Sequence, residues 1–237
     1  MILKLFVLAA AIAQVAAAAL LNIGAFENTD RALPVFIQPA GWAFSIWGLI
    51  YTLSLIYAVY QIIPTNDNKI LRATRLPALA GFLGSIAWLY FAGQTDWTIW
   101  LTIPILFFMA GAFTYVVNTP DSGAKTQTLL SKKFLLPYAA WTGVASWLNI
   151  QALLNDQLVV TDGTVNLITN GVLFGCIAAF TLYYFKRSGY SAWYGGVLVW
   201  AGVGVIAANL DEGNVVFVGL AGLLVTAVVG LCFWAEK

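Results

Sequence analysis

Eight long apolar segments run through this 237-residue chain and limit what it can fold into. Each has about 20 residues, the length that an α-helix needs to cross the hydrocarbon core of a bilayer. Only 9% of the residues are charged, whereas a soluble domain has about 25%. The segments are Leu5–Leu21, Gly41–Ile63, Leu76–Ala92, Trp97–Val117, Phe134–Leu154, Asn166–Phe185, Tyr190–Asn209 and Asn214–Trp234.

The connections between these segments are short, so the sequence predicts an all-α, polytopic membrane bundle of about eight transmembrane helices. Membrane β-barrels show alternating segments of about ten residues, and the runs here are longer and uniformly apolar. The first segment, with Lys4 before it and the small residues Ala16–Ala19 near its end, resembles a signal peptide. We expect it to be retained as a span.

Charge placement predicts the orientation. With the N-terminus inside, Arg31 alone of the 11 basic residues falls outside, and most acidic residues lie in outer loops. Positive charge kept inside is the usual orientation signal. We therefore expect an integral, multi-pass protein with both termini cytoplasmic, in a bacterial-type inner membrane or an organellar membrane. The inner basic residues are Lys4, Lys69, Arg72, Arg75, Lys125, Lys132, Lys133, Lys186, Arg187 and Lys237.

The residue types missing from the spans exclude a retinal protein and disfavour proton-coupled transport and intramembrane hydrolysis. The chain has no histidine, the commonest ligand of haem and zinc and the usual general base. No lysine lies within a span to form a retinal Schiff base, and no carboxylate lies at membrane depth to couple proton transport. We predict no catalytic residues and no metal site. A net charge of +1 gives no indication of a nucleic-acid partner.

The stretch PAGWAFSIWGLIY, residues 39–51, enters the second span with four large aromatic residues. At 100° per residue, Phe44, Trp47 and Tyr51 fall within about 60° on one face, and Trp42 lies at the mouth. Aromatic residues also gather at bilayer interfaces for general reasons. The stretch alone is therefore compatible with an interfacial belt or with one wall of a pocket.

A second stripe lies in the fifth span, residues 135–155. Tyr138, Trp141, Ala145 and Asn149 fall within about 80° of one another. Two aromatic walls, one small residue and one amide are the properties that a lipophilic ligand site needs. Ordinary helix packing is the alternative interpretation of the same spacing.

Small residues and one proline indicate how the helices pack. Gly171 and Gly175 form a GxxxG motif, which indicates close packing against this chain or another. Pro104 lies within the fourth segment, where a proline favours a kink and a cavity beside it.

The two aromatic segments together resemble the TspO/MBR family, the tryptophan-rich sensory proteins that include the mitochondrial translocator protein. The family pattern of the second span appears here as Pro39, Trp42, Phe44, Trp47 and Tyr51. The pattern of the fifth span appears as Pro137, Tyr138, Ala140, Trp141, Ala145, Leu148 and Asn149. The resemblance covers about residues 1–156.

This resemblance implies a five-helix bundle over residues 1–156 that encloses a pocket under the first loop, residues 24–40. Residues 157–237 would then form three additional helices packed on it. Members bind porphyrins and sterols and often form dimers. The chain departs from the family in a Trp42–Trp47 spacing one residue shorter, and in having no tryptophan between Asn149 and Asn155.

We therefore predict a membrane binding, sensory or carrier protein for a hydrophobic planar ligand, such as a tetrapyrrole or a sterol-like molecule. No cofactor is required, although a bound tetrapyrrole fits the site. Its expected partners are the bilayer, this small molecule, and a second copy or a larger membrane complex. The alternatives are a scaffold subunit of such a complex, a facilitative transporter of an uncharged solute and, less favoured, a porphyrin-oxidising enzyme. The predicted ligand-binding residues are Trp42, Phe44, Trp47, Tyr51, Tyr138, Trp141, Ala145 and Asn149.

Overall fold

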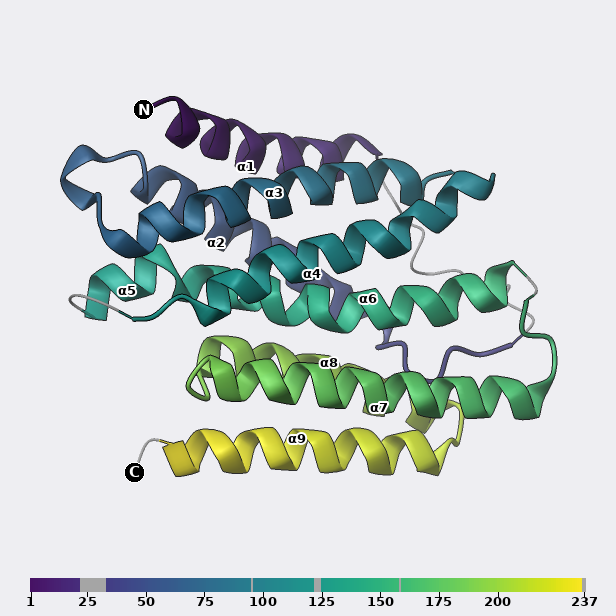
Figure 1. Cartoon of the computed structure of the whole chain (residues 1–237). Helices are drawn as coiled ribbons and strands as arrows, with labels where there is room; N and C mark the ends of the chain where they lie inside the picture. The colour runs from purple at the N-terminus through teal and green to yellow at the C-terminus, as the bar shows by residue number, and fades with distance from the viewer. Residues whose placement is uncertain (22–32, 95, 122–124, 158, 236–237) are drawn as a thin grey trace. The chain divides into compact units, whose positions relative to one another are not determined.

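The computed structural model describes the chain except for residues 22–32, 95, 122–124, 158 and 236–237 (Figure 1). The regular structure of the described residues is helical, without strands. Eight long helices lie at the eight predicted segments, which confirms an all-α helical bundle. They are α1 (Ile2–Leu21), α2 (Ile46–Tyr60), α3 (Lys69–Ala92), α4 (Thr102–Asn118), α6 (Leu136–Asp156), α7 (Gly163–Arg187), α8 (Ala192–Asp211) and α9 (Val215–Ala235).

Short helices complete the fold. A seven-residue helix that the sequence did not predict, α5 (Lys125–Ser131), precedes α6. Four 3₁₀ helices lie between the longer elements: η1 (Gly41–Ser45), η2 (Pro64–Asn66), η3 (Trp97–Leu101) and η4 (Lys133–Leu135).

Seven of the eight predicted spans are long and apolar enough to cross a membrane, and α6 is the exception. Its 21 residues extend about 31 Å, which matches the hydrocarbon core. Asn149, Gln151 and Asn155 lower its hydropathy. Every residue of α6 is buried or half-buried, and polar side chains in membrane helices generally face the bundle interior.

Two of the helices that begin earlier than hydropathy predicts, α3 and α7, are capped by polar side chains. Helix α3 starts at Lys69 instead of Leu76, and the Asn68 side chain accepts a hydrogen bond of 2.9 Å from the Leu71 N–H. Helix α7 starts at Gly163, after Asp162, whose carboxylate accepts from two backbone N–H groups of the first turn. Hydropathy locates the apolar part of a helix, whereas side-chain caps set where the backbone turns begin.

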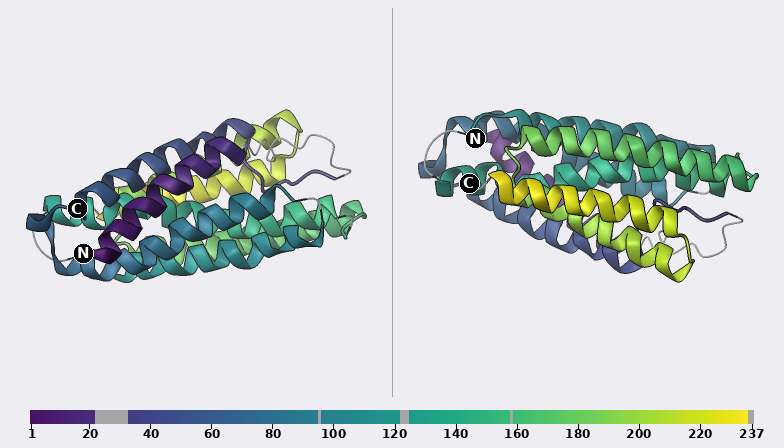
Figure 2. Two further views of the ribbon diagram at one scale, coloured as in Figure 1. Left: turned by 90° about the horizontal axis from the view of Figure 1, so that it is seen from above. Right: turned by 90° about the horizontal axis from the view of Figure 1, so that it is seen from below.

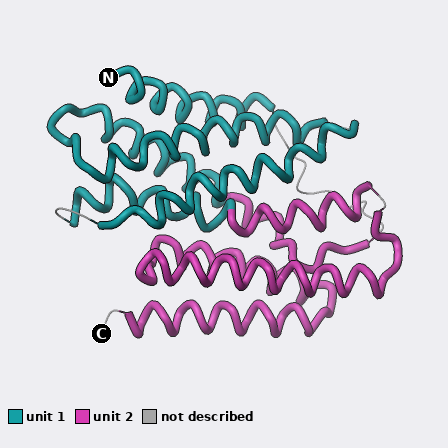
Figure 3. The backbone as a smooth tube through the Cα atoms, viewed as in Figure 1, with its two compact units in different colours: residues 1–24, 46–142 teal, residues 25–45, 143–237 magenta. Residues whose placement is uncertain are grey.

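The chain divides into two compact units (Figure 3). Unit 1 comprises Met1–Gly24 and Ile46–Thr142, and unit 2 comprises Ala25–Ser45 and Gly143–Lys237. The boundary falls within α6, so that the first part of this helix belongs to unit 1 and the rest to unit 2. The division after residue 156 that the sequence suggested stays a prediction.

In unit 1, α1 packs against α2 and α3, and α3 lies beside α4 (Figures 1 and 2). The buried face of α1 consists of Val7, Ala10, Ala11 and Gln14, which recur at helical spacing. Between α3 and α4 the close contacts occur at glycines. A Cβ atom at Gly84 would lie 2.5 Å from Cγ of Met109, and one at Gly81 would overlap the Phe113 ring.

In unit 2, α8 lies beside α9 (Figure 2). A Cβ at Gly202 would approach Val225 to 2.5 Å, and one at Gly204 would approach Pro39 and Ala43 to 2.8 and 2.9 Å. The GxxxG motif behaves differently, because a Cβ at Gly171 or Gly175 meets nothing within 4 Å among the described residues. In unit 2, close contacts therefore occur at glycines of α8 and not at the GxxxG motif of α7.

Both units expose large apolar side chains. On α7 the exposed fraction of Val172 is 61%, and on α9 that of Leu223 is 71%. Extended apolar surface of this kind is rare on soluble proteins and suits contact with lipid chains. The exposed apolar faces and the high hydropathy of the helices therefore both indicate a membrane environment.

Candidate functional site

Trp47 lies at the centre of a cluster of rings in unit 1. Trp47 and Tyr51, one turn apart on α2, stack with ring centroids 5.3 Å apart. Trp88 of α3 stacks against Trp47 at 6.0 Å. From α6, Tyr138 and Trp141 meet the Trp47 ring edge-on at 5.7 and 6.4 Å. We call these five residues the aromatic cluster.

The aromatic cluster brings together four predicted site residues from two distant segments. The spacing of Trp47 and Tyr51 on α2 and of Tyr138 and Trp141 on α6 was predicted from the sequence. Tyr138 and Trp141 are fully buried, whereas Trp47 and Tyr51 are half-buried. The α2 side of the cluster is therefore its more accessible side.

Tyr138 lies within a second group of rings that the sequence did not single out. Its ring stacks on Phe113 of α4 at 4.2 Å and on Phe82 of α3 at 6.0 Å. Its hydroxyl donates a hydrogen bond of 2.9 Å to Oε1 of Gln14 on α1. The signal that could have indicated this group is Gly81, which leaves room for the Phe113 ring.

The other four predicted site residues belong to unit 2. The Trp42 ring meets Trp200 of α8 edge-on at 4.9 Å, and Trp200 Nε1 donates a 2.7 Å hydrogen bond to the Ala43 carbonyl. Trp42 is exposed over 47% of its surface, and Phe44 is half-buried. Both lie in η1, a 3₁₀ helix, so the α-helical projection that grouped Phe44 with Trp47 does not apply.

Ala145 and Asn149 lie on the part of α6 that belongs to unit 2, and both are half-buried. Their position one and two turns beyond Trp141 on the same helix agrees with the predicted stripe. A common ligand for all eight residues stays a prediction.

Buried amides hold the segment 33–37 in unit 2. Asn155 of α6 donates to the carbonyls of Leu33 and Pro34 at 3.2 Å each, and Asn166 of α7 donates to Pro34 at 3.0 Å. The Ile37 N–H donates to Asn170 at 3.2 Å. Within the group, Gln151 links Asn155 and Asn166. We call Gln151, Asn155, Asn166 and Asn170 the amide network.

Helix α8 continues this attachment along the segment. Asn209 donates to the Phe36 carbonyl at 2.8 Å, and the Ala40 N–H donates to the Gly204 carbonyl at 3.0 Å. The first loop, residues 24–40, was predicted to cover the mouth of the pocket. Residues 24–32 lie outside the described part, and residues 33–40 are a strap bonded to three helices. Amide side chains four residues apart, Gln151 with Asn155 and Asn166 with Asn170, are the sequence signal that could have indicated this network.

Two cavities among the described residues lie away from the aromatic cluster. A cavity of about 20 Å³, lined by Ile37, Phe174, Thr181 and other residues of unit 2, is the size of one water molecule. An open apolar groove of about 540 Å³ runs between α3 and α4, with Leu76, Leu83, Pro104 and Phe108 in its wall. Pro104 lies in the first turn of α4, where a proline is tolerated.

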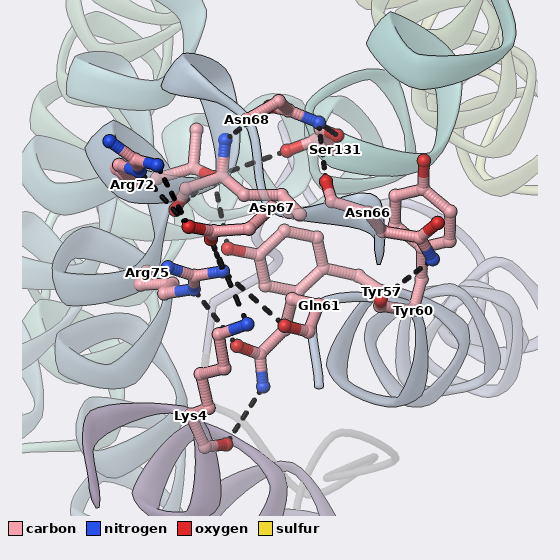
Figure 4. Close-up of polar contacts among 12 residues, drawn as sticks. Lys4, Tyr57, Tyr60, Gln61, Asn66, Asp67, Asn68, Arg72, Arg75 and Ser131 are labelled. Atoms are coloured by element: carbon pink, nitrogen blue, oxygen red, sulfur yellow. Dashed lines mark hydrogen bonds and ion pairs between the residues drawn. The ribbon is translucent and has the colours of Figure 1, made fainter. Parts of the chain in front are cut away.

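A polar cluster at the connection between α2 and α3 was not anticipated (Figure 4). Asp67 receives hydrogen bonds from Arg75 at 2.5 Å and Arg72 at 3.1 Å, and Lys4 Nζ lies 3.7 Å from it. Arg75 is buried and also donates to Gln61, which donates to the Lys4 carbonyl at 2.8 Å. The cluster thus joins α1, α2 and α3 at one end of unit 1.

The basic neighbours stabilise the charged form of Asp67. The hydrogen bond from Arg75, reinforced by Arg72, lowers the pKa of Asp67 to about 2, against an opposing desolvation effect. A carboxyl whose pKa is depressed on folding stabilises the fold above its unfolded pKa of about 4. That contribution is lost as the pH falls towards the folded value.

We expect Asp67→Asn to lower the thermal unfolding midpoint in detergent at pH 7, since it leaves the buried Arg75 guanidinium without its carboxylate. The difference from the unaltered protein should narrow as the pH is lowered from about 4 to about 2. Asp211→Asn, at the exposed end of α8, is the control and should change little. A difference between Asp67→Asn and the unaltered protein that is constant over this pH range would contradict the assignment.

Long apolar helices with exposed apolar faces define a polytopic membrane protein. The chain belongs to the TSPO-like protein family, whose model matches residues 1–233. This confirms the resemblance and extends it past residue 156 into the last three long helices. Comparisons with curated proteins and with solved structures gave no match. Family membership indicates a binding, sensory or transport role in the membrane.

Proposed function

We propose that this protein binds a hydrophobic planar ligand of the tetrapyrrole class through the aromatic cluster of unit 1. The observation that carries the proposal is the arrangement of four rings around Trp47, with centroids 5.3 to 6.4 Å away. Aromatic rings at such distances interact favourably with further rings, stacked or edge-on. A planar ligand that replaces one of these rings, or packs against one of them, would make similar stacked or edge-on contacts.

The burial of the individual rings indicates the side from which a ligand would reach the aromatic cluster. Because Trp47 and Tyr51 are half-buried and Tyr138 and Trp141 are fully buried, the ligand would contact the α2 rings first. Rearrangement of the half-buried rings also requires less loss of packing than movement of the buried ones. Family membership supports a binding or transport role, and the ligand class is our proposal.

We also propose that both termini are cytoplasmic. The support is the basic charge that the sequence places on one side of the spans, including Lys4, Arg72 and Lys132. In this orientation the Asp67 cluster lies at the cytoplasmic end of unit 1. The strap of residues 33–40, which follows α1, then lies towards the outer side of unit 2.

The test is a titration of purified protein with protoporphyrin, followed by tryptophan quenching and by the shift of the porphyrin absorption band. The unaltered protein should bind saturably in the micromolar range. Trp47→Leu should raise Kd about tenfold, equivalent to about 1.4 kcal/mol. Trp47 is preferable to Trp141, whose truncation in a fully buried position would cost about 3–5 kcal/mol of stability.

Trp97→Leu is the matched control, because it also removes one tryptophan of unit 1. Trp97 lies in η3, is exposed over 72% of its surface and should leave Kd unchanged. Absence of saturable binding by the unaltered protein would refute the proposal. Equal effects of the two substitutions would show that the ligand binds away from the aromatic cluster.

A further inference from the structure

Gln14 is a buried amide within the apolar helix α1. Its side chain is fully shielded from solvent, and its neighbours on the buried face are Val7, Ala10 and Ala11. A primary amide has two N–H donors and one carbonyl acceptor. Placing it at this depth is costly unless those groups are hydrogen-bonded.

Of the two polar atoms of the Gln14 amide, only the oxygen has a hydrogen-bond partner among the described residues. Oε1 accepts the hydrogen bond from the Tyr138 hydroxyl, at 2.9 Å. Nε2 has no hydrogen-bond partner among the residues that the structure describes. Buried donors in proteins are nearly always paired, with protein, water or ligand. A donor left over at this position therefore indicates an acceptor that the described residues do not provide.

The location of the amide connects it to the aromatic cluster. The Tyr138 ring that holds Oε1 meets Trp47 at 5.7 Å and stacks on Phe113 at 4.2 Å. Since Tyr138 is fully buried between these rings, its hydroxyl holds the orientation of the Gln14 amide. The Gln14 amide thus lies at the hydroxyl of one ring of the cluster, on a helix that contributes no aromatic residue to it.

We infer that Gln14 positions the ligand by donating from Nε2 to a carbonyl or carboxylate oxygen at the ligand's periphery. This inference rests on the proposed function and narrows it to planar ligands that carry such an acceptor. Because the donor is neutral, it recognises the acceptor oxygen and does not require a negative charge. Gln14 is a positioning and specificity residue in this scheme, and the rings supply the stacking surface.

Two neutral porphyrins separate the contribution of the acceptor from that of the rings. Protoporphyrin dimethyl ester carries carbonyl acceptors at its edge, and octaethylporphyrin carries only alkyl groups there. The unaltered protein should bind the ester about tenfold more tightly, equivalent to about 1.4 kcal/mol. Gln14→Met, which keeps an unbranched side chain of similar size, should remove this preference and leave the affinity for octaethylporphyrin unchanged.

Thr114→Val is the matched control, because it also removes a buried polar group from unit 1. The Thr114 hydroxyl donates within its own helix, to the Gly111 carbonyl at 2.8 Å, so the preference for the ester should persist. Infrared spectra of the ester bound to the unaltered protein provide a test that needs no variant. A hydrogen bond from Gln14 should lower the ester carbonyl frequency.

The outcomes distinguish the two proposals. If neither porphyrin binds the unaltered protein, the proposed function is wrong. If both bind with equal affinity, or if Gln14→Met changes both affinities by the same factor, the protein binds porphyrins and the role of Gln14 is wrong. An unshifted carbonyl frequency in the bound ester would also overturn it.

Discussion

Gly81→Ala is expected to destabilise the protein by about 1–3 kcal/mol, the range that overpacking of a well-packed core produces. A Cβ atom at position 81 would overlap the Phe113 ring. That ring is fully buried and stacks on Tyr138 at 4.2 Å, so it cannot move aside without displacing the aromatic residues around it. The thermal unfolding midpoint in detergent measures the effect.

Gly111→Ala is the matched control on α4. A Cβ there meets nothing within 4 Å among the described residues, and alanine has a helix propensity about 1 kcal/mol better than glycine. The two substitutions should therefore change stability in opposite directions. Because Tyr138 contacts Trp47, Gly81→Ala should also weaken porphyrin binding. Equal stabilities for the two variants would show that Phe113 has room to move.

The second large effect is expected at Asn166, in the amide network of unit 2. Its Oδ1 accepts from Gln151 at 3.0 Å and from Asn170 at 3.2 Å, and its Nδ2 donates to the Pro34 carbonyl at 3.0 Å. Asn166→Leu removes these bonds and leaves buried polar groups with fewer partners, at a cost of about 1–3 kcal/mol. Faster hydrogen exchange at the backbone N–H of Ile37 would report the loosening of the strap.

Thr169→Val tests whether that result is specific. Thr169 lies on the same helix, and its hydroxyl donates to the Val165 carbonyl of α7 at 2.9 Å. The substitution should leave the exchange rate at Ile37 unchanged. If Asn166→Leu also leaves it unchanged, the strap is held by packing and by α8, and not by the amide network.

The helices could be predicted from the sequence with small errors at their ends. Both errors discussed above, at Lys69 and Gly163, occur where a polar side chain caps the helix. Hydropathy is insensitive to such caps because they act through one or two hydrogen bonds outside the apolar run. Helix α6 differs from these two helices. Polar residues lower its hydropathy, and the sequence still predicts a span at this position.

The candidate site was predictable only in part. Trp47 and Tyr51, or Tyr138 and Trp141, can be paired from spacing because each pair shares one helix. The contacts of Tyr138 with Phe113 and Gln14 join residues on three helices, and no local pattern relates their positions. The α-helical projection does not apply to Phe44, because residues 41–45 form a 3₁₀ helix. Its place in a ligand site stays a prediction.

What the sequence by itself determined is the number and approximate position of the eight long helices. An apolar segment in lipid has to pair its backbone polar groups internally, and a helix does so. Only the tertiary structure decided which side chains meet across helices. In a bilayer the apolar faces of helices are nearly interchangeable, so partners are selected by shape and by scarce polar groups. The close approach of Phe113 to Gly81 is an example of selection by shape, and the hydrogen bond from Tyr138 to Gln14 is an example of selection by polar groups.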